Sequence, residues 1–399
     1  MAVGDGSRFP GVGKGSRILI AGAGLAGLRA AQAARAAGHE GEIILIGDEP
    51  HPPYTRPPLS KELLKGEQTA EGCAFPGLEV LEAELRLSTT ITAVDADAHT
   101  VTLIDGTTLD YGRLILATGV RARALPHLTG GHTLRDLADA AKLSDALAHT
   151  RKLAIVGAGF IGCEVAASAR HRGVDVALID LAPQPLLPLG PELGARCAQL
   201  HRDRGVELHL GAAIDAVDDE GVHLADGTAV PADLVLIAVG AQPNTEFLGA
   251  SGIELAPDGG VVCDATLTSV SDPDVLAAGD IAFWPHPGAG GERVRVEHWT
   301  TAAEHGRLAG ANATKDPAER AAHVAPPYFW SDQYELKIQS VGFPARAARI
   351  EIVEEEIGSH PPRLIAEALG EDGELVGAVA FNHARRLAEY RRRLAVEYA

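Results

Sequence analysis

A glycine-rich segment with the same surroundings occurs twice in this chain, and it constrains the fold more than any other feature. Each time, a short apolar run leads into the pattern G-x-G-x-x-G, an alanine-rich stretch follows, and a second apolar run ends on an aspartate. We interpret the apolar runs as buried parallel strands and the alanine-rich stretch as a helix. The first copy covers residues 17–48 and the second covers residues 152–180.

Each glycine of such a unit has its own physical task. The first permits a tight turn, the second lets backbone N–H groups approach a pyrophosphate, and the third lets the helix pack on the strand. The aspartate can accept hydrogen bonds from a ribose. Two complete copies therefore predict two dinucleotide sites. Their residues are Gly22, Gly24, Ala26, Gly27 and Asp48 in the first copy, and Gly157, Gly159, Phe160, Ile161, Gly162 and Asp180 in the second.

Asp180 also indicates which nicotinamide dinucleotide binds. A carboxylate at this position bonds a free 2′-hydroxyl and repels a 2′-phosphate. The stretch that follows, residues 181–190, contains no Arg or Lys that would hold a phosphate. We therefore expect NADH rather than NADPH at the second site.

Three further apolar runs, at 114–119, 234–240 and 275–280, look like strands that end at glycine. Ligands bind at such strand ends in doubly wound sheets. We expect these runs to contribute Ala117, Thr118, Gly119, Gly240, Gly279 and Asp280 to the cofactor sites. Residues 133–136 read as a capping box that opens an amphipathic helix over 134–147. After about residue 324 the pattern predicts a small α+β domain, with strands in 350–357 and 363–370 and a basic helix over 383–394.

Charge and cysteine content exclude several function classes. A net charge of −19 opposes binding to nucleic acid. The four cysteines form no C-x-x-C pair, so neither a metal site nor a redox dithiol is predicted. Residues 1–15 read as a flexible Gly-rich lead-in, and no stretch approaches the ~20 apolar residues of a membrane span. We therefore expect a cytoplasmic protein without a membrane partner.

Several motifs together resemble one known family, the FAD-dependent ferredoxin reductases that feed haem monooxygenases and aromatic-ring dioxygenases. These reductases belong to the wider glutathione-reductase-like flavoproteins. The resemblance extends from Arg17 to about Arg393, and its most discriminating part is RPPLSK at 56–61. The other segments are GAGLAGLRAA (22–31), LILATGVRARALP (114–126), TLRDLADAAKL (133–143), IVGAGFIGCEVAA (155–167), LIAVGAQPNTE (236–246), VLAAGDIA (275–282) and VEHWTTAAEHG (296–306).

The resemblance implies an α/β fold with two Rossmann-like domains, one for FAD and one for NAD, and a C-terminal α+β domain. Residues 1–120 and 242–323 would form the FAD-binding domain, and residues 121–241 would form the NAD-binding domain inserted into it. Residues 324–399 would form an interface domain that covers the flavin and helps to receive a protein partner.

The resemblance also implies roles for individual residues. The first glycine motif and Asp48 would hold the ADP half of FAD, and Asp280 would bond its ribityl chain. Arg56 and Lys61 would approach the pyrophosphate and the flavin. The segment 296–306 would flank the isoalloxazine, with Glu304 at its pyrimidine end; its expected contact residues are Glu297, His298 and Trp299.

Lys61 and Glu164 are the expected catalytic pair. The resemblance implies that they meet near flavin N5, where a lysine favours negative charge on the reduced flavin. A simpler interpretation of Glu164 remains open. It lies in the first turn of a helix, where a carboxylate stabilises the helix dipole by ~0.3–1 kcal/mol.

The implied reaction passes the C4 hydride of NADH to FAD, which then gives single electrons to two molecules of an iron–sulfur ferredoxin that supplies an oxygenase. Disulfide reductases of the wider superfamily carry C-x-x-x-x-C where this chain has residues 54–64, and that stretch holds no cysteine. Electrons must therefore leave the flavin directly. Trp330 either lines this exit or is an ordinary core aromatic, and the basic helix at 383–394 either steers an acidic ferredoxin or is a plain solvated helix.

Two other functions stay open at this stage. One is a related reductase with another acceptor, such as rubredoxin, a quinone or oxygen. The other is an NADH-sensing flavoprotein whose oligomeric state changes when NADH binds. One departure from the family pattern is Pro188, which stands where a basic residue is common.

Overall fold

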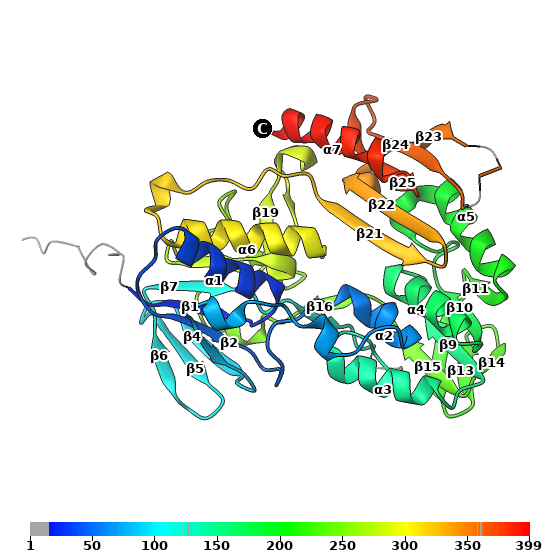
Figure 1. Cartoon of the computed structure of the whole chain (residues 1–399), viewed down its shortest axis with the longest axis horizontal. Coiled ribbons are helices and arrows are strands. Elements are labelled where there is room, and N and C mark those ends of the chain that lie inside the picture. The colour runs from blue at the N-terminus through cyan, green and yellow to red at the C-terminus, as the bar shows by residue number, and fades with distance from the viewer. Residues whose placement is uncertain (1–15, 126–127, 129, 357, 360) are drawn as a thin grey trace, which may run out of the picture.

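The computed structural model describes residues 16–125, 128, 130–356, 358–359 and 361–399. The predicted lead-in at 1–15 lies outside these residues. Figure 1 shows three units: a sheet with α1 and α6 at one end, a second sheet with α3, α4 and α5 at the other, and a third sheet with α7 above them. Among the described residues, no helix has the length and apolarity needed to cross a bilayer.

The first unit is built on a parallel five-stranded sheet in the order β18-β7-β1-β2-β3. The strands β1, β2, β7 and β18 are buried along their whole length, as predicted for continuous apolar runs. Its last strand in sequence, β18, returns to pair with β7 after the whole second unit has been built. The strands are β1 (Ile18–Ala21), β2 (Ile43–Ile46), β3 (Glu84–Arg86), β7 (Arg113–Leu116) and β18 (Val275–Ala277).

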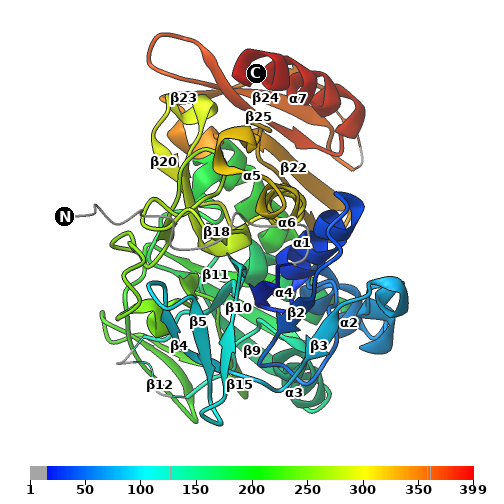
Figure 2. The same ribbon diagram turned by 90° about the vertical axis from the view of Figure 1, so that its left-hand side faces the viewer.

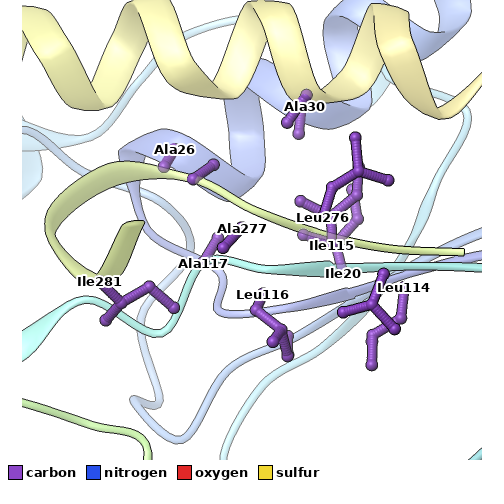
Figure 3. Packing of buried hydrophobic residues seen from close by; sticks show 14 of the residues in the cluster. Ile20, Ala26, Ala30, Leu114, Ile115, Leu116, Ala117, Leu276, Ala277 and Ile281 are labelled. Carbon is purple, nitrogen blue, oxygen red and sulfur yellow. The ribbon is translucent and has the colours of Figure 1, made fainter. Parts of the chain in front are cut away.

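Helices α1 (Leu25–Ala36) and α6 (Trp299–Ala313) cross in close contact on this sheet. A Cβ on Gly306 would lie 2.3 Å from the carbonyl oxygen of Ala26, and one on Gly310 would lie 2.1 Å from that of Ala30. Figure 3 shows Ala26 and Ala30 of α1 beneath α6, with Ile20 and the rest of the sheet below them. Small residues on both helices therefore hold the start of α1 firmly over the strand ends.

Smaller antiparallel elements complete this unit. Hydrophobic residues of β4 and β5 share its core. The pair β8 and β16 lies where the chain leaves for the second unit and returns from it. The strands are β4 (Ile91–Asp95), β5 (Thr100–Leu103), β6 (Thr108–Asp110), β8 (Val120–Ala122), β16 (Ala241–Pro243), β17 (Val261–Val262), β19 (Ala282–Pro285) and β20 (Arg293–Val294), with the short helix α2 (Glu62–Lys65).

The second unit repeats the strand–helix–strand arrangement on a parallel sheet ordered β11-β10-β9-β15. Helix α4 begins directly after the second glycine loop, and most of it is buried. The elements are β9 (Lys152–Val156), β10 (Asp175–Asp180), β11 (Val206–Leu210), β15 (Leu234–Ile237), α3 (Leu137–Leu147), α4 (Phe160–His171) and α5 (Gly190–Asp203), with the antiparallel strands β12 (Ile214–Asp218), β13 (Gly221–Leu224) and β14 (Ala229–Pro231).

The predicted capping box at 133–136 is corrected by the structure. Helix α3 begins at Leu137, and its cap is Asp136, whose carboxylate accepts a hydrogen bond from the backbone N–H of Asp139. Thr133 instead donates to the Asp139 side chain. The helix starts three residues later than expected, and residues 133–136, which are not helical, line the cavity described below.

The third unit is an antiparallel sheet in the order β21-β22-β25-β24-β23, with α7 packed on it. The two strands and the basic helix expected from the sequence are present, so the predicted α+β unit is confirmed. In Figure 2 this sheet and α7 lie at the top of the molecule. The elements are β21 (Tyr328–Gln333), β22 (Leu336–Gly342), β23 (Arg349–Glu355), β24 (Leu364–Leu369), β25 (Leu375–Phe381) and α7 (Ala384–Tyr398).

Candidate functional site

A cavity of 810 Å³ lies where the three units meet. Both glycine loops, the segment before α2, the start of α6 and the first strand of the C-terminal sheet contribute to its wall. Its volume is near the upper end of the range for small-molecule sites, as an extended ligand requires. The predicted residues that line it are Gly22, Gly24, Ala26, Asp48, Arg56, Lys61, Ala117, Thr118, Gly119, Gly159, Phe160, Ile161, Glu164, Gly240, Gly279, Asp280, Glu297, His298 and Trp299.

The first and third glycines of the two loops have matching surroundings. Gly22 and Gly157 adopt φ values of +117° and +108°, and a Cβ on either would lie within 2.3 Å of a carbonyl oxygen on a neighbouring strand end. A Cβ on Gly27 or Gly162 would lie 1.9 Å from the carbonyl oxygen of the first glycine of its own loop. These four positions are therefore glycine for reasons of backbone packing, and Gly27, Gly157 and Gly162 do not line the cavity.

The middle glycines differ from the others. A Cβ on Gly24 or Gly159 would meet nothing within 4 Å, and both residues line the cavity at the start of a helix. The space that a side chain would fill is open to a ligand, and the helix N-terminus favours an anion there. Both loops thus fit the pyrophosphate of a dinucleotide.

The two aspartates that end the repeated units are placed differently. Asp48 lines the cavity. Asp180 lies behind its own glycine loop, where its carboxylate accepts hydrogen bonds from the backbone N–H of Ala158 at 2.5 Å and of Ala182 at 2.7 Å. Asp180 therefore braces the second loop in this structure and does not line the cavity.

Arg56 belongs to a network that the sequence did not predict. Its guanidinium contacts the Glu49 carboxylate at 2.5 Å, the Tyr54 hydroxyl at 3.0 Å and the carbonyl oxygen of Arg135 at 2.7 Å. Burial opposes its charge, but the nearby Tyr54 and Glu49 outweigh burial and raise the pKa of Arg56. Arg135 in turn pairs with Asp280 at 2.9 Å.

Arg135 and Glu49 both line the cavity and were missed as site residues. Each of the two residues stands next to a motif that was identified from the sequence. Arg135 stands directly before the cap of α3, and Glu49 directly follows Asp48. A charged residue beside a strand end or a helix start would have been a usable signal for both.

Lys61 and Glu164 meet in the wall of the cavity. The Lys61 ammonium lies 2.6 Å from the Glu164 carboxylate, and the two residues are only 6% and 3% exposed. Hydroxyls of Ser60 and Ser331 also donate to this carboxylate, at 2.5 Å and 2.7 Å. A buried ion pair needs such additional hydrogen bonds to offset the loss of hydration. Helix α4 begins at Phe160, so Glu164 lies beyond its first turn, and the simpler interpretation as a carboxylate in the first turn is wrong.

Aromatic rings form the wall around this pair. Phe160 and Phe329 pack edge to face with centroids 4.5 Å apart, and Trp299 and Trp330 lie 6.0 Å apart. Buried polar atoms without a partner among the described residues include Nε1 of Trp299 and Nδ1 of His298. Because both residues line the cavity, these atoms are available to a bound ligand. Burial lowers the pKa of His298 to about 4, so its ring is neutral near pH 7.

Two residues of the segment 296–306 face other partners. The Glu297 carboxylate pairs with Arg295 at 2.5 Å, although Glu297 lines the cavity. Glu304 does not line the cavity, and its expected place at the pyrimidine end of the flavin stays a prediction. It pairs with Arg391 of α7 at 3.1 Å, because this face of α6 points toward the C-terminal helix.

The four cysteines Cys73, Cys163, Cys197 and Cys263 are buried, and none forms a disulfide. Cys163 lies in the second glycine motif, where burial raises the pKa of its thiol well above the ordinary value. A thiol held protonated is a poor nucleophile.

Comparison with protein families identifies two matches along the chain. Residues 16–306 match the pyridine nucleotide-disulphide oxidoreductase family, and residues 328–398 match a reductase C-terminal family. The first match ends within α6, and the second begins at Tyr328, the first residue of β21 and of the third unit.

Characterised relatives match over most of their length. The ferredoxin--NAD(+) reductase component of the p-cumate 2,3-dioxygenase system of Pseudomonas putida is 37% identical, with 94% of this chain and 92% of that protein covered. The corresponding component of the biphenyl dioxygenase system of Paraburkholderia xenovorans is 38% identical, with coverage of 93% and 91%. Among solved structures, the covalent putidaredoxin reductase–putidaredoxin complex matches with a TM-score of 0.88 and 32% identity, covering 96% of this chain and 93% of that one. The chain therefore belongs to the pyridine nucleotide-disulphide oxidoreductases, in the branch that contains the ferredoxin--NAD(+) reductase components of oxygenase systems.

Proposed function

We propose that this protein is an NADH-dependent ferredoxin reductase that uses FAD and supplies electrons to an oxygenase through an iron–sulfur ferredoxin. The observation that carries the proposal is that both glycine loops open on one cavity, with the buried Lys61–Glu164 pair in its wall. Relatives that span nearly the whole chain are ferredoxin--NAD(+) reductase components.

The residues of the first unit fit FAD. The open position at Gly24 and the start of α1 suit the pyrophosphate, and Asp48 suits the adenosine ribose. Asp280, held by Arg135, lies in the cavity wall together with Trp299, whose free indole N–H can donate to a flavin. When bound, FAD accepts a hydride from NADH and releases electrons one at a time, and this chemistry belongs to the cofactor.

The chain's own residues supply position and charge. Lys61 places a positive charge at the wall of the cavity, and a fixed charge stabilises negative charge that develops beside it. The four aromatic rings of Phe160, Phe329, Trp299 and Trp330 restrict water around this point. Backbone N–H groups at the start of α4, next to the open position at Gly159, suit the pyrophosphate of NADH.

The preference for NADH over NADPH is part of the proposal. Asp180 directs a carboxylate at the second loop, and residues 181–190 contain no basic side chain. A 2′-phosphate brought near this loop would be repelled.

The domain division, the cellular location and the partner are proposed on the same basis. The FAD-binding domain comprises 1–120 and 242–323, the NAD-binding domain comprises 121–241, and the C-terminal interface domain comprises 324–399. The pairing of β8 with β16, at both crossing points, supports these limits. We propose a cytoplasmic location, which suits four unpaired cysteines. The acidic chain presents the arginines of α7, which would attract an acidic ferredoxin.

The test is rapid mixing of the purified flavoprotein with NADH or NADPH, followed by reduction of a panel of ferredoxins. We expect NADH to reduce the flavin faster than NADPH, and at least one ferredoxin to be reduced faster than rubredoxin, a quinone or oxygen. A preference for NADPH would refute the role given to Asp180. If no iron–sulfur protein outperformed these other acceptors, the ferredoxin assignment would be wrong.

A further inference from the structure

A line of buried hydrogen bonds leads from Glu164 away from the cavity into the C-terminal sheet. Ser331 donates to Oε1 of Glu164 at 2.7 Å, and Gln333 donates to the Ser331 hydroxyl at 3.2 Å. The side-chain oxygen of Gln333 lies 3.2 Å from Nε2 of His201, and Nδ1 of His201 lies 3.2 Å from the Tyr334 hydroxyl. Ser331, Gln333 and His201 are each 0% exposed.

The geometry of this line allows one direction only. A carboxylate can only accept, so the Ser331 hydroxyl must donate to Glu164 and receive its own hydrogen bond from the amide N–H of Gln333. The amide oxygen of Gln333 must then accept from Nε2–H of His201. Nδ1 of His201 is left as an acceptor, which the Tyr334 hydroxyl satisfies. Each donor therefore points toward Glu164.

His201 has the protonation state that this direction demands. Burial lowers its pKa to about 4, against the opposing effect of its hydrogen bond to Gln333. The ring is therefore neutral near pH 7, with one nitrogen that donates and one that accepts. A charged ring would have to donate from both nitrogens and would leave the Tyr334 hydroxyl as its acceptor.

The three segments that supply this line are far apart in the sequence. Strand β21 lies against α4, and side chains two residues apart on a strand share a face. Phe329 therefore packs on Phe160 of α4. Two residues further along the strand, Ser331 donates a hydrogen bond to Glu164 of the same helix. After two more residues, Gln333 contacts His201 of α5. The C-terminal sheet is thus connected to the Lys61–Glu164 pair by alternate residues of one strand.

Building this polar line has an energetic cost that simple packing would avoid. A buried polar group without a hydrogen bond costs free energy, and an apolar core is as stable as a satisfied polar network or more so. Ser340, on the neighbouring strand β22, offers a comparison. It is 1% exposed, and its hydroxyl has no hydrogen-bond partner among the described residues. A buried serine in this sheet can therefore lack hydrogen bonds, whereas Ser331 is hydrogen-bonded on both sides.

We propose that Ser331, Gln333 and His201 are positioning residues for the reaction, which hold the Glu164 carboxylate in line with Lys61. The inference rests on the proposed function, because it gives the Lys61–Glu164 pair a part in that reaction. None of the three lines the cavity, so they act through Glu164. The seating of the C-terminal sheet on α4 thereby controls where the Glu164 carboxylate lies relative to Lys61.

Two variants test the direction of the line. Ser331→Ala removes the donor to Oε1 of Glu164 and adds no bulk. Gln333→Glu keeps the shape but substitutes an acceptor, so that the Ser331 hydroxyl is drawn away from Glu164. We expect both to slow flavin reduction at saturating NADH by about tenfold, and the dissociation constant for NADH to stay within about twofold. The matched control Ser340→Ala is expected to change neither quantity.

A second readout is independent of turnover. Nitrogen NMR of histidine-labelled holoprotein, with His201 assigned from a His201→Gln sample, is expected to show Nε2 protonated and Nδ1 unprotonated at pH 7. In Gln333→Glu both nitrogens should carry a proton, because the new carboxylate stabilises the charged ring. A wild-type ring protonated at Nδ1 would overturn the proposal, as would unchanged flavin reduction in both variants. If wild-type protein bound FAD but NADH did not reduce it, the proposed function would fail instead, and the NMR result would still decide the direction of the line.

Discussion

The ammonium of Lys61 lies 2.6 Å from the carboxylate of Glu164, although 103 positions separate the two residues in the chain. The first residue precedes α2 and the second lies in α4, and both are almost fully buried. Their meeting joins the two dinucleotide-binding units at the wall of one cavity.

Removal of one member of this pair should be costly for stability. Glu164→Ala leaves the Lys61 ammonium buried without its partner, and the free energy of unfolding should fall by about 3–5 kcal/mol. Urea denaturation of the flavin-free protein measures this change. The matched control is Glu207→Ala, which breaks the more exposed pair with Lys152, where a loss below about 1 kcal/mol is expected. Equal losses in the two variants would show that the buried pair contributes no more to the free energy of unfolding than the exposed pair.

The second and third glycines of the first loop should respond differently to alanine. Gly27→Ala places a Cβ 1.9 Å from the carbonyl oxygen of Gly22, so the protein should lose its cooperative unfolding transition. Gly24→Ala adds a methyl group in open space of the cavity. Its flavin-free form should melt within a few degrees of wild type, at about 1 kcal/mol or less of destabilisation, while FAD binding is lost. Thermal melts together with FAD absorbance distinguish these outcomes. Retention of FAD by Gly24→Ala would contradict the assignment of the first loop.

Asp180 should determine the choice of dinucleotide. Asp180→Ala removes the repulsion toward a 2′-phosphate, and we expect the ratio of kcat/KM for NADH over NADPH to fall by about tenfold. Asp175→Ala is the control, because that residue lies at the other end of the same strand with an exposed side chain. An unchanged ratio in Asp180→Ala would mean that other residues exclude NADPH.

His298 should make folding sensitive to acid. Its pKa falls from 6.5 in the unfolded chain to about 4 in the folded protein, because burial disfavours the charged ring. Between these values the unfolded state binds more protons than the folded state. The contribution of the neutral His298 ring to the free energy of unfolding is therefore complete above pH 6.5 and is lost as the pH falls toward 4. In His298→Phe the dependence of the unfolding free energy on pH should be shallower by about 1 kcal/mol per pH unit in this window. Denaturation series at several pH values measure the slope, and parallel slopes for variant and wild type would exclude a neutral buried ring.

Much of the fold could be predicted because its signals are local. The strand, glycine loop, helix and acid of each repeated unit lie within about 35 consecutive residues. The third glycine of each loop packs against the carbonyl oxygen of the first glycine of the same loop. The same applies to the α+β character of the C-terminal unit, which followed from alternating apolar residues. The predicted start of α3 was wrong. Residues 133–136 line the cavity, and the helix begins after its cap at Asp136.

The interior of the site could be predicted only in part. Most predicted cofactor residues line the cavity, because they belong to the motifs themselves. The contacts of Arg135 with Asp280 and of Ser331 with Glu164 span 145 and 167 positions. No local pattern encodes such contacts, since they depend on how separate units pack together. The pairing of Glu304 with Arg391 was missed for the same reason, because α7 lies at the far end of the sequence.

By itself, the sequence determined two dinucleotide-binding units, the candidate residues of their loops and the absence of a cysteine pair in the segment 54–64. Turn sterics, strand periodicity and side-chain chemistry act over short stretches of chain, so they can be inferred without coordinates. The tertiary structure alone decided that both loops open on one cavity, that Asp180 braces its loop, and that the C-terminal sheet reaches Glu164 through Ser331. Those arrangements arise from the packing of three units against one another, where burial favours hydrogen bonds between polar groups that are distant in the sequence.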